Sequence, residues 1–287
     1  ISMKKIKIAL LKIYFLFKER FLFKDKFNLK YYLYRNTRPY DTLERGVRTD
    51  DTTVLTTIEH ILSTLKTNKN KEIIHCVDVG AFIGVVSLMM SKGLRQQENE
   101  WNIHCFEPYK DTFNRLVDNI AMDSCHSNFI LNNTGLSDKT GLYSMSVEDD
   151  CPGQNHLTVK KNGNGCKLAK VKITTLSSYL SEKSISHVNL CKVDAEGVDH
   201  LVIKGLGKYL EKHKVDYFVL EYDRGNSQEQ LRKMLSKYNY SIYYMVRNES
   251  YIVKNIDEYP SSSKSILNIL AISPNADNTI VNALLRP

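Results

Sequence analysis

The feature that most constrains the fold is a regular alternation of short apolar runs with segments of helical period, which starts near residue 73. The runs are rich in β-branched and aromatic residues and end at turn residues, as buried strands do. They cover residues 73–79, 103–106, 129–131, 188–193 and 215–220. Apolar residues recur at helical spacing over residues 85–94, 113–121, 198–210 and 228–238.

This alternation predicts an α/β fold, with a mostly parallel sheet and helices on both faces. Residues 240–246, 251–253 and 269–272 are expected to close the sheet, partly as antiparallel strands. Residues 36–72 are expected to form a helical lead-in, and residues 141–170 an insertion with β character. Ligands of such sheets bind beyond the carboxyl ends of the strands, so the strand ends are where chemistry is expected.

The formal net charge of +8 is concentrated at one end of the chain. Residues 1–38 contain eleven Lys and Arg against two acids, so the remainder is close to neutral. A basic face spread over the fold is therefore not expected, and nucleic acid is disfavoured as a partner.

The basic N-terminal extension, residues 1–35, combines this charge with aromatic and aliphatic residues. Charges interrupt it too often for a membrane-spanning helix, which needs roughly 20 mostly apolar residues, or for a signal peptide. One interpretation is an amphipathic helix in which residues 3–35 contact an anionic membrane surface or a partner. The alternative is a helical extension that packs its phenylalanines, among them Phe21 and Phe23, on its own domain.

The six cysteines lack the spacing of a structural zinc site. Cys76, Cys105 and Cys191 fall inside apolar runs, where a free thiol behaves as a small hydrophobic residue. This usage indicates a reducing compartment and hence a cytoplasmic location.

The first chemical motif is Val-Asp-Val-Gly-Ala-Phe-Ile-Gly at residues 77–84, which ends a strand and opens a helix. Gly80 and Gly84 would let the backbone approach a ligand at a helix N-terminus. The nicotinamide fingerprint needs a further glycine at the position of Phe82, which counts against a dehydrogenase. A tight structural turn is the alternative.

The second motif is Glu107, directly after the strand at residues 103–106. A carboxylate at this place can accept hydrogen bonds from both hydroxyls of a ribose. The alternative is an acid that caps the helix opened by Pro108. Together with the glycine-rich turn, Glu107 describes an adenosine pocket.

The third motif is Asn-Leu-Cys-Lys-Val-Asp-Ala-Glu-Gly at residues 189–197. If the strand continues through it, Lys192, Asp194 and Glu196 share one face. Charges at the end of a buried strand are costly unless they are paired or act on a ligand. An ion-pair network around Lys192 is the structural alternative.

As a set and in this order, the motifs resemble the FkbM family of S-adenosylmethionine-dependent methyltransferases over residues 73–223. Besides VDVGAFIG, they are CFEP, LSDKTG, KVDAEGVD and VLEYD. The resemblance implies a class I methyltransferase (Rossmann-like) fold, with a seven-stranded sheet whose last strand is antiparallel, and methylation of a hydroxyl, often on a sugar or glycan precursor. It also implies one methyltransferase domain over residues 36–287, with the cofactor-binding core at 73–223 and closing strands at 224–287.

By this resemblance, Asp78, Gly80 and Gly84 flank the methionine part of S-adenosylmethionine, and Glu107 holds its ribose. Asp194 and Glu196 would lie beside the reactive end. The full set of cofactor-binding residues that it implies is Asp78, Gly80, Ala81, Phe82, Gly84, Glu107, Pro108, Leu136, Ser137 and Asp194, with Leu136 and Ser137 near the adenine. Two departures stand out, because the family usually has Asn at the position of Phe82 and Phe-Glu at the position of Val198-Asp199.

The expected reaction is in-line displacement at the sulfonium methyl by an acceptor oxygen, assisted by a general base. The candidate bases, in order, are Asp194, Glu196, His200 and Glu221. Asp194, Glu221 and Asp223 could instead hold a divalent cation that lowers the pKa of the hydroxyl. The residues expected to bind an anionic or sugar-phosphate acceptor, or else to form a solvated loop, are Arg38, Tyr40, Arg45 and Arg48.

Two other classes stay open at this point. One is a nucleotide- or NAD-binding oxidoreductase on a similar sheet, which cofactor selectivity would distinguish. The other is a non-catalytic binding or scaffold module, for which the basic extension would be the working part. Retention of the acids expected at the strand ends, Asp78, Glu107, Asp194 and Glu196, favours an enzyme.

Overall fold

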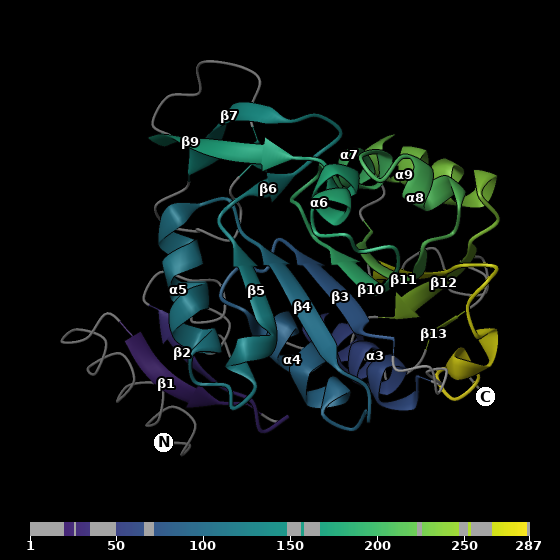
Figure 1. Ribbon diagram of the computed structural model, residues 1–287, viewed down its shortest axis with the longest axis horizontal. Coiled ribbons are helices and arrows are strands. Elements are labelled where there is room, and N and C mark those ends of the chain that lie inside the picture. Colours follow the sequence, from purple (N-terminus) through teal and green to yellow (C-terminus); the bar gives the residue numbers. More distant parts are fainter. Residues whose placement is uncertain are drawn as a thin grey trace, which may run out of the picture.

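A computed structural model describes residues 20–25, 27–34, 50–65, 72–147, 156–157, 167–222, 226–246, 252–253 and 266–285. Its centre is an eight-stranded sheet with the order β13-β12-β14-β11-β10-β3-β4-β5 (Figure 1). The strands are β3 (Ile74–Val79), β4 (Trp101–Phe106), β5 (Phe129–Asn132), β10 (Val188–Val193), β11 (Val215–Glu221), β12 (Ser241–Val246), β13 (Ile252–Val253) and β14 (Ile266–Ile272).

The pairing of the strands confirms the predicted class I sheet. The strands from β5 to β11 are parallel, and β14 runs antiparallel between β11 and β12. The order changes direction at β3, whose two neighbours are β4 and β10. The two-residue strand β13 adds an eighth strand at the edge, antiparallel to β12.

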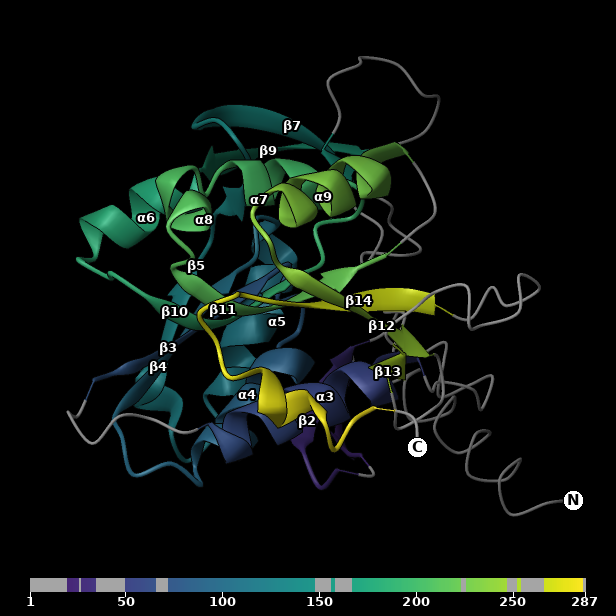
Figure 2. The same cartoon turned by 90° about the vertical axis from the view of Figure 1, so that its right-hand side faces the viewer.

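Helices cover both faces of the sheet, because side chains of each buried strand point alternately to two separate cores (Figure 2). On β3, Cys76 belongs to one core, and Val77 and Val79 belong to the other. The first core receives α3 (Asp50–Thr64), α4 (Val85–Leu94) and α5 (Lys110–Ile120). The second receives α6 (Leu176–Glu182), α7 (Asp199–Lys204), α8 (Lys208–Glu211) and α9 (Asn226–Lys237). Two 3₁₀ turns complete the described elements, η1 (His126–Asn128) and η4 (Asn278–Val281).

The predicted helix over residues 198–210 is two helices. The chain turns between α7 and α8, where Gly207 adopts a φ of +50°. Glycine tolerates this left-handed conformation, whereas most other residues do not. The apolar period continues across the break because both helices pack on the same core.

The predicted insertion is a separate four-stranded sheet with the order β6-β9-β7-β8. Its strands are β6 (Gly135–Leu136), β7 (Gly141–Val147), β8 (His156–Leu157) and β9 (Lys167–Thr174). Figure 1 shows β7 and β9 beyond the ends of the central strands, on the side where the helices α6, α7 and α9 lie. One face buries Met145, Val171 and Ile173 against Tyr109. Tyr109 follows β4 closely, so this small sheet adjoins the carboxyl edge of the large one.

The prediction of a helical N-terminal extension is wrong for the described part. β1 (Arg20–Lys24) and β2 (Lys30–Tyr34) form an antiparallel hairpin. The local reason is a turn in which Asp25 Oδ1 accepts hydrogen bonds from the backbone N–H groups of Phe27 and Leu29, while Asn28 is left-handed. Residues 1–19 and 35, and with them most of the predicted amphipathic arm, lie outside the described residues.

The hairpin packs on its own domain. The alternative interpretation predicted such packing for the phenylalanines of the extension, and Phe23 shows it. Phe23 packs against the first core and, at 5.7 Å between ring centroids, edge-on to Tyr31. Asn119 on α5 joins the hairpin by accepting from the backbone N–H of Tyr32 and donating to its carbonyl oxygen. Within the described ranges, no helix is both long and apolar enough to cross a membrane.

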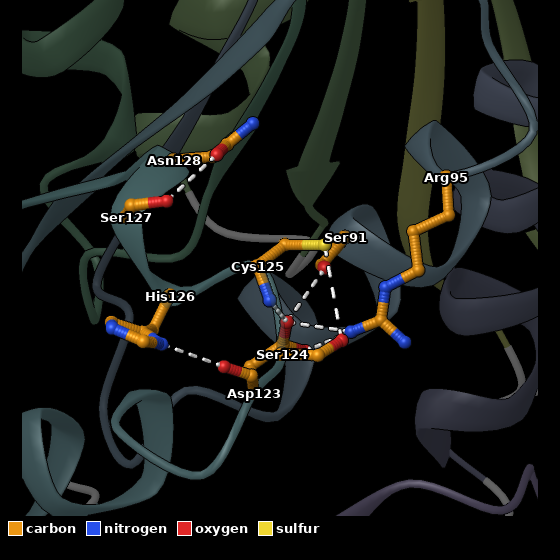
Figure 3. A network of polar contacts seen from close by, with 8 residues as sticks. All are labelled: Ser91, Arg95, Asp123, Ser124, Cys125, His126, Ser127 and Asn128. Carbon is orange, nitrogen blue, oxygen red and sulfur yellow. Dashed lines mark hydrogen bonds and ion pairs between the residues drawn. The ribbon is translucent and has the colours of Figure 1, made fainter.

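A polar network joins the end of α4 to the segment that leads into β5 (Figure 3). Arg95 Nη2 lies 2.5 and 2.6 Å from the two carboxylate oxygens of Asp123. Asp123 Oδ1 also accepts from Ser91 Oγ and from the backbone N–H of Cys125. Helices that follow parallel strands run back toward the amino edge of the sheet, so this Asp123 network lies opposite the strand ends where ligands bind.

Candidate active site

Three strand ends meet at the carboxyl edge of the sheet, around its central strand β3. Val79, the last residue of β3, pairs with Phe106 on one side and Val193 on the other. Gly80, Glu107 and Asp194 therefore follow side by side, and the backbone N–H of Asp194 donates to the carbonyl oxygen of Val79 at 3.1 Å. The predicted motifs thus converge in space as expected.

The glycine-rich turn after β3 has a backbone that few other residues would allow. Gly80 and Gly84 have φ values of +72° and +92°, and Phe82 between them has +50°. A Cβ on Gly80 would lie 1.9 Å from the carbonyl oxygen of Asp194, so the turn and the end of β10 are in direct backbone contact. The fold therefore requires glycine at position 80 even without a ligand. This is what the alternative interpretation of the motif, a tight structural turn, predicted.

Glu107 is held in a fixed orientation by that same turn. Its Oε2 accepts from the backbone N–H of Phe82 at 3.2 Å, and its Oε1 accepts from the backbone N–H of Tyr109 at 2.9 Å. Tyr109 directly precedes α5, so Glu107 accepts a hydrogen bond at the start of this helix, as an acid that caps the helix would. Burial raises the pKa of Glu107 to about 7, although the two backbone N–H groups favour the carboxylate. A carboxylate has about four acceptor positions, so capacity for further donors remains.

Asp78, Lys192 and Asp194 form an ion-pair chain beneath the turn. Lys192 Nζ lies 3.2 Å from Asp194 Oδ2 and 3.9 Å from Asp78 Oδ1. Asp78 is fully buried, and its Oδ2 accepts from Ser87 Oγ on α4. Burial raises the pKa of Asp78, while Lys192 opposes that change. The ion-pair network around Lys192 is therefore present, and it positions Asp194 at the edge of the sheet.

The prediction that Lys192, Asp194 and Glu196 share one strand face is wrong for Glu196. β10 ends at Val193, and the chain then turns toward α7, with Glu196 in a left-handed conformation at a φ of +49°. The strand ends because the chain must turn to enter α7 at Asp199. Lys192 and Asp194 still meet, as residues two apart on a strand do.

Acidic side chains from two neighbouring strand ends face one another here. Glu221 ends β11, and burial together with the charges of Asp194, Asp199 and Glu196 raises its pKa to about 8. Burial and Asp194 also raise the pKa of Asp199. Three of the four candidate bases thus lie in one electrostatic environment, in which Glu221 keeps its proton near neutral pH.

Asp199 is not among the predicted site residues, although it lies in the same environment. Its Oδ1 accepts from the backbone N–H of Ala195 at 3.1 Å, and only 1% of the residue is exposed. The sequence feature that could have indicated Asp199 is an acidic residue at the start of a predicted helix, three residues after Glu196. His200, the next residue, is half-buried, and its Nδ1 has no hydrogen-bond partner among the described residues.

The remaining predicted cofactor residues surround the same edge. Ala81 is buried in the turn, and Pro108 is half-buried beside Gly135. Leu136 and Ser137 are buried, and the backbone N–H of Ser137 donates to the carbonyl oxygen of Thr174 at the end of the insertion.

Five predicted residues lie outside the described part of the chain. They are the four proposed acceptor-binding residues and one proposed metal ligand: Arg38, Tyr40, Arg45, Arg48 and Asp223. Among the residues that the structure does describe, no three His, Cys, Asp or Glu side chains are grouped to hold a metal ion.

Comparison with known proteins gives a family match over the same region. The model of the family described as "Methyltransferase FkbM domain" matches residues 78–242, which is more than half of the chain. This range includes all three strand ends.

Two curated proteins and one solved structure are similar to the chain. The hexuronic acid methyltransferase AglP of Haloferax volcanii is 26% identical over 178 residues, which are 61% of this chain and 68% of that protein. The methyltransferase sdnD of Sordaria araneosa is 27% identical over 157 residues, 45% of this chain and 59% of that protein. The crystal structure of methyltransferase FkbM from Methylobacillus flagellatus is 14% identical, with a TM-score of 0.41, over 73% of this chain and 47% of that one.

Proposed function

The chain belongs to the FkbM family of S-adenosylmethionine-dependent methyltransferases, and we propose that it methylates a hydroxyl group of a sugar, glycan or glycan precursor. Membership of this family makes it a methyltransferase and sets aside the oxidoreductase and scaffold alternatives. The name of AglP, which acts on a hexuronic acid, supports a sugar acceptor. The observation that carries the proposal is the convergence of Gly80, Glu107 and Asp194 at one edge of the sheet.

The residues at this edge fit the cofactor. Glu107 is fixed by two backbone N–H groups and keeps acceptor positions for the two ribose hydroxyls. Asp78 Oδ1 has no hydrogen-bond partner in the described part of the chain, and Lys192 is its nearest cation at 3.9 Å. We assign Asp78, Gly80 and Gly84 to the methionine part, Glu107 to the ribose, and Leu136 with Ser137 to the adenine side. Ala81, Phe82 and Pro108 complete the proposed pocket.

The protein's task in the reaction is to align the acceptor and accept its proton. S-adenosylmethionine supplies, when bound, an electrophilic methyl group on a sulfonium. We propose Asp194 as the general base, because its side chain is 42% exposed at the edge while Lys192 fixes one of its oxygens. Glu196, His200 and Glu221 are the further candidates. General-base assistance of this kind is worth about 10²–10⁴ in rate.

Three further assignments are part of the proposal. The residues proposed to contact the acceptor are Arg38, Tyr40, Arg45 and Arg48. The candidate ligands of a divalent cation are Asp194, Glu221 and Asp223. Measuring activity after EDTA treatment, and again after Mg²⁺ is added, tests whether a cation is needed. The free, buried thiols of Cys76, Cys105 and Cys191 support a cytoplasmic location. Three expectations stay predictions: that residues 3–35 contact an anionic membrane, that nucleic acid is not a partner, and that the domain limits lie at residues 35 and 36.

The test is calorimetric titration of the protein with S-adenosylmethionine, S-adenosylhomocysteine and NAD. We expect micromolar binding of the first two and none of NAD. Glu107→Ala should weaken that binding about 30- to 100-fold, because hydrogen bonds to a charged group contribute about 2–3 kcal/mol. Glu98→Ala, an exposed glutamate before β4, is the matched control and should bind normally. Preference for NAD, or normal binding by Glu107→Ala, would contradict the proposed pocket.

A further inference from the structure

Two buried side chains near the proposed site have hydrogen-bond acceptors without partners. Asp199 is 1% exposed and Gln228 is 3% exposed. Asp199 Oδ2 and Gln228 Oε1 have no hydrogen-bond partner within the described ranges. Leaving a buried acceptor unpaired costs stability, so such groups are rare in native proteins and call for an explanation.

The topology places these two residues in the first turns of two neighbouring helices. α7 follows β10 and α9 follows β11, and these strands are parallel neighbours. Both helices therefore begin at the carboxyl edge of the sheet, with Asp199 and Gln228 in their first turns. α7 and α9 pack against each other, and both views show them side by side (Figures 1 and 2). His200 Nδ1, also without a partner among the described residues, lies in the same turn of α7.

Asp199 lies near enough to the proposed reactive end to interact with its acids. Asp199 interacts electrostatically with Asp194 and with Glu221, the last residues before the turns at this edge. Its other oxygen, Oδ1, is occupied by the backbone N–H of Ala195. Asp199 Oδ2 is thus left for a group that arrives beside Asp194.

The chemistry of the unpaired atoms indicates the chemistry of their ligand. Carboxylate and amide oxygens accept hydrogen bonds, so the ligand must bring donors, as hydroxyl and ammonium groups do. The neighbouring acids Asp194 and Glu196 supply negative charge, Glu221 adds a carboxyl group that is largely protonated at neutral pH, and Lys192 is already within 3.9 Å of two acids. A second carboxylate or a phosphate would be repelled at this place.

We propose, on the premise that the protein is a sugar methyltransferase, that Asp199 and Gln228 form the acceptor subsite and that it selects neutral or amino sugars over acidic ones. The two oxygens receive hydrogen bonds from hydroxyl or ammonium groups that flank the reacting hydroxyl. This selectivity differs from that of the hexuronic acid methyltransferase to which the chain is similar. Asp199 and Gln228 act in binding and orientation, and Asp194 remains the proposed base.

The test combines Gln228→Met with a matched control, Gln230→Met, which makes the same change at an exposed position of the same helix. Saturation-transfer NMR of the full chain with S-adenosylhomocysteine uses glucose, glucosamine and glucuronate as probes. We expect glucose and glucosamine to bind, glucuronate to give no signal, and Gln228→Met to weaken the first two about 5- to 10-fold. Asp199→Asn removes a negative charge and should let glucuronate bind measurably.

Thermal unfolding provides a readout that needs no sugar. Gln228→Met removes an unpaired buried acceptor, so its Tm should equal or exceed that of the original protein, with unchanged binding of S-adenosylhomocysteine. A Tm several degrees lower would show that Gln228 is hydrogen-bonded for structural reasons, which overturns the subsite. Binding of glucuronate as strong as that of glucose, or no binding of any probe, overturns the proposed selectivity. Failure to bind S-adenosylhomocysteine at all would instead count against the proposed function.

Discussion

Two aspartates at opposite edges of the sheet, the half-buried Asp123 and the buried Asp199, show how differently the two edges are built. Asp123 has Arg95, Ser91 and the backbone N–H of Cys125 around its carboxylate, so both oxygens are paired. Asp199 has one oxygen paired with the backbone N–H of Ala195 and one with no hydrogen-bond partner within the described ranges. The first arrangement stabilises the fold, whereas the second has a cost that a ligand can offset.

The largest expected effect is a loss of turnover after a substitution at the carboxyl edge of the sheet. Asp194→Asn keeps the shape of the side chain but removes the charge that accepts the acceptor's proton. We expect the turnover rate to fall about 10²–10⁴-fold, while the affinity for S-adenosylmethionine changes little. Single-turnover methyl transfer together with calorimetry measures both quantities. Full turnover with intact cofactor affinity would mean that Asp194 is not the base, and Glu196, His200 and Glu221 would be the next to test.

The second effect concerns stability at the other edge. Asp123→Ala leaves the Cys125 N–H and the Arg95 guanidinium without their carboxylate, and we expect about 2 kcal/mol of lost stability. Most of this comes from the half-buried contact with the backbone N–H of Cys125, because the Arg95 side chain is 42% exposed and water screens its charge. Urea unfolding measures the loss, and the turnover rate should not change.

Glu229→Ala is the control for that measurement, since it breaks an ion pair with Arg232 on an exposed helix surface. It should shift the midpoint of unfolding far less than Asp123→Ala does. If the two variants were equally stable, the Asp123 network would not be the stabilising element that its geometry indicates.

The third effect is a pH dependence of stability at the carboxyl edge. Glu221 has a pKa of about 8 in the folded protein, raised by burial and by neighbouring acids from an ordinary value of 4.5. The folded chain therefore holds this proton more tightly than the unfolded chain, and stability at this site declines as pH rises from about 5 to 8. Glu221→Gln removes the titrating group, so its Tm should decline less than that of the original protein over the same range.

Thermal unfolding between pH 5 and 8.5 measures this difference. Glu229→Gln serves as the control, because Arg232 lowers the pKa of Glu229 and its titration lies below the range. Parallel curves for Glu221→Gln and the original protein would mean that Glu221 is ionised throughout.

The central sheet could be predicted because its strands are buried and uninterrupted. The helix at residues 85–94 and the strand at 188–193 were predicted to the residue, and Gly80 and Glu107 ended their strands as expected. In each case a long apolar pattern is closed by a turn residue, so local signals and tertiary packing agree.

What could not be predicted depends on contacts between distant segments or on short elements. α6 has only seven residues, and its one clear signal is Thr175, whose side chain accepts from the backbone N–H of Ser178. Charge and aromatic content predict a helix where the β1–β2 hairpin lies, whereas the turn at Asp25 and Asn28 favours the hairpin. Asp199 Oδ2 and Gln228 Oε1 are without partners in the described part of the chain, on two helices that pack against each other, and no local pattern encodes this.

The insertion has a consequence for how such an enzyme can diversify. The chain leaves the core at Ser137 and returns at Thr174, and a backbone hydrogen bond of 3.0 Å joins these two points. A segment whose ends already meet can be lengthened, shortened or replaced at little entropic cost, because the closure of the loop is set by its base. Residues 138–173 are therefore a segment that can be exchanged as a unit. Grafting this segment from a relative would change the surface beside the carboxyl edge while the strands of the central sheet keep their positions.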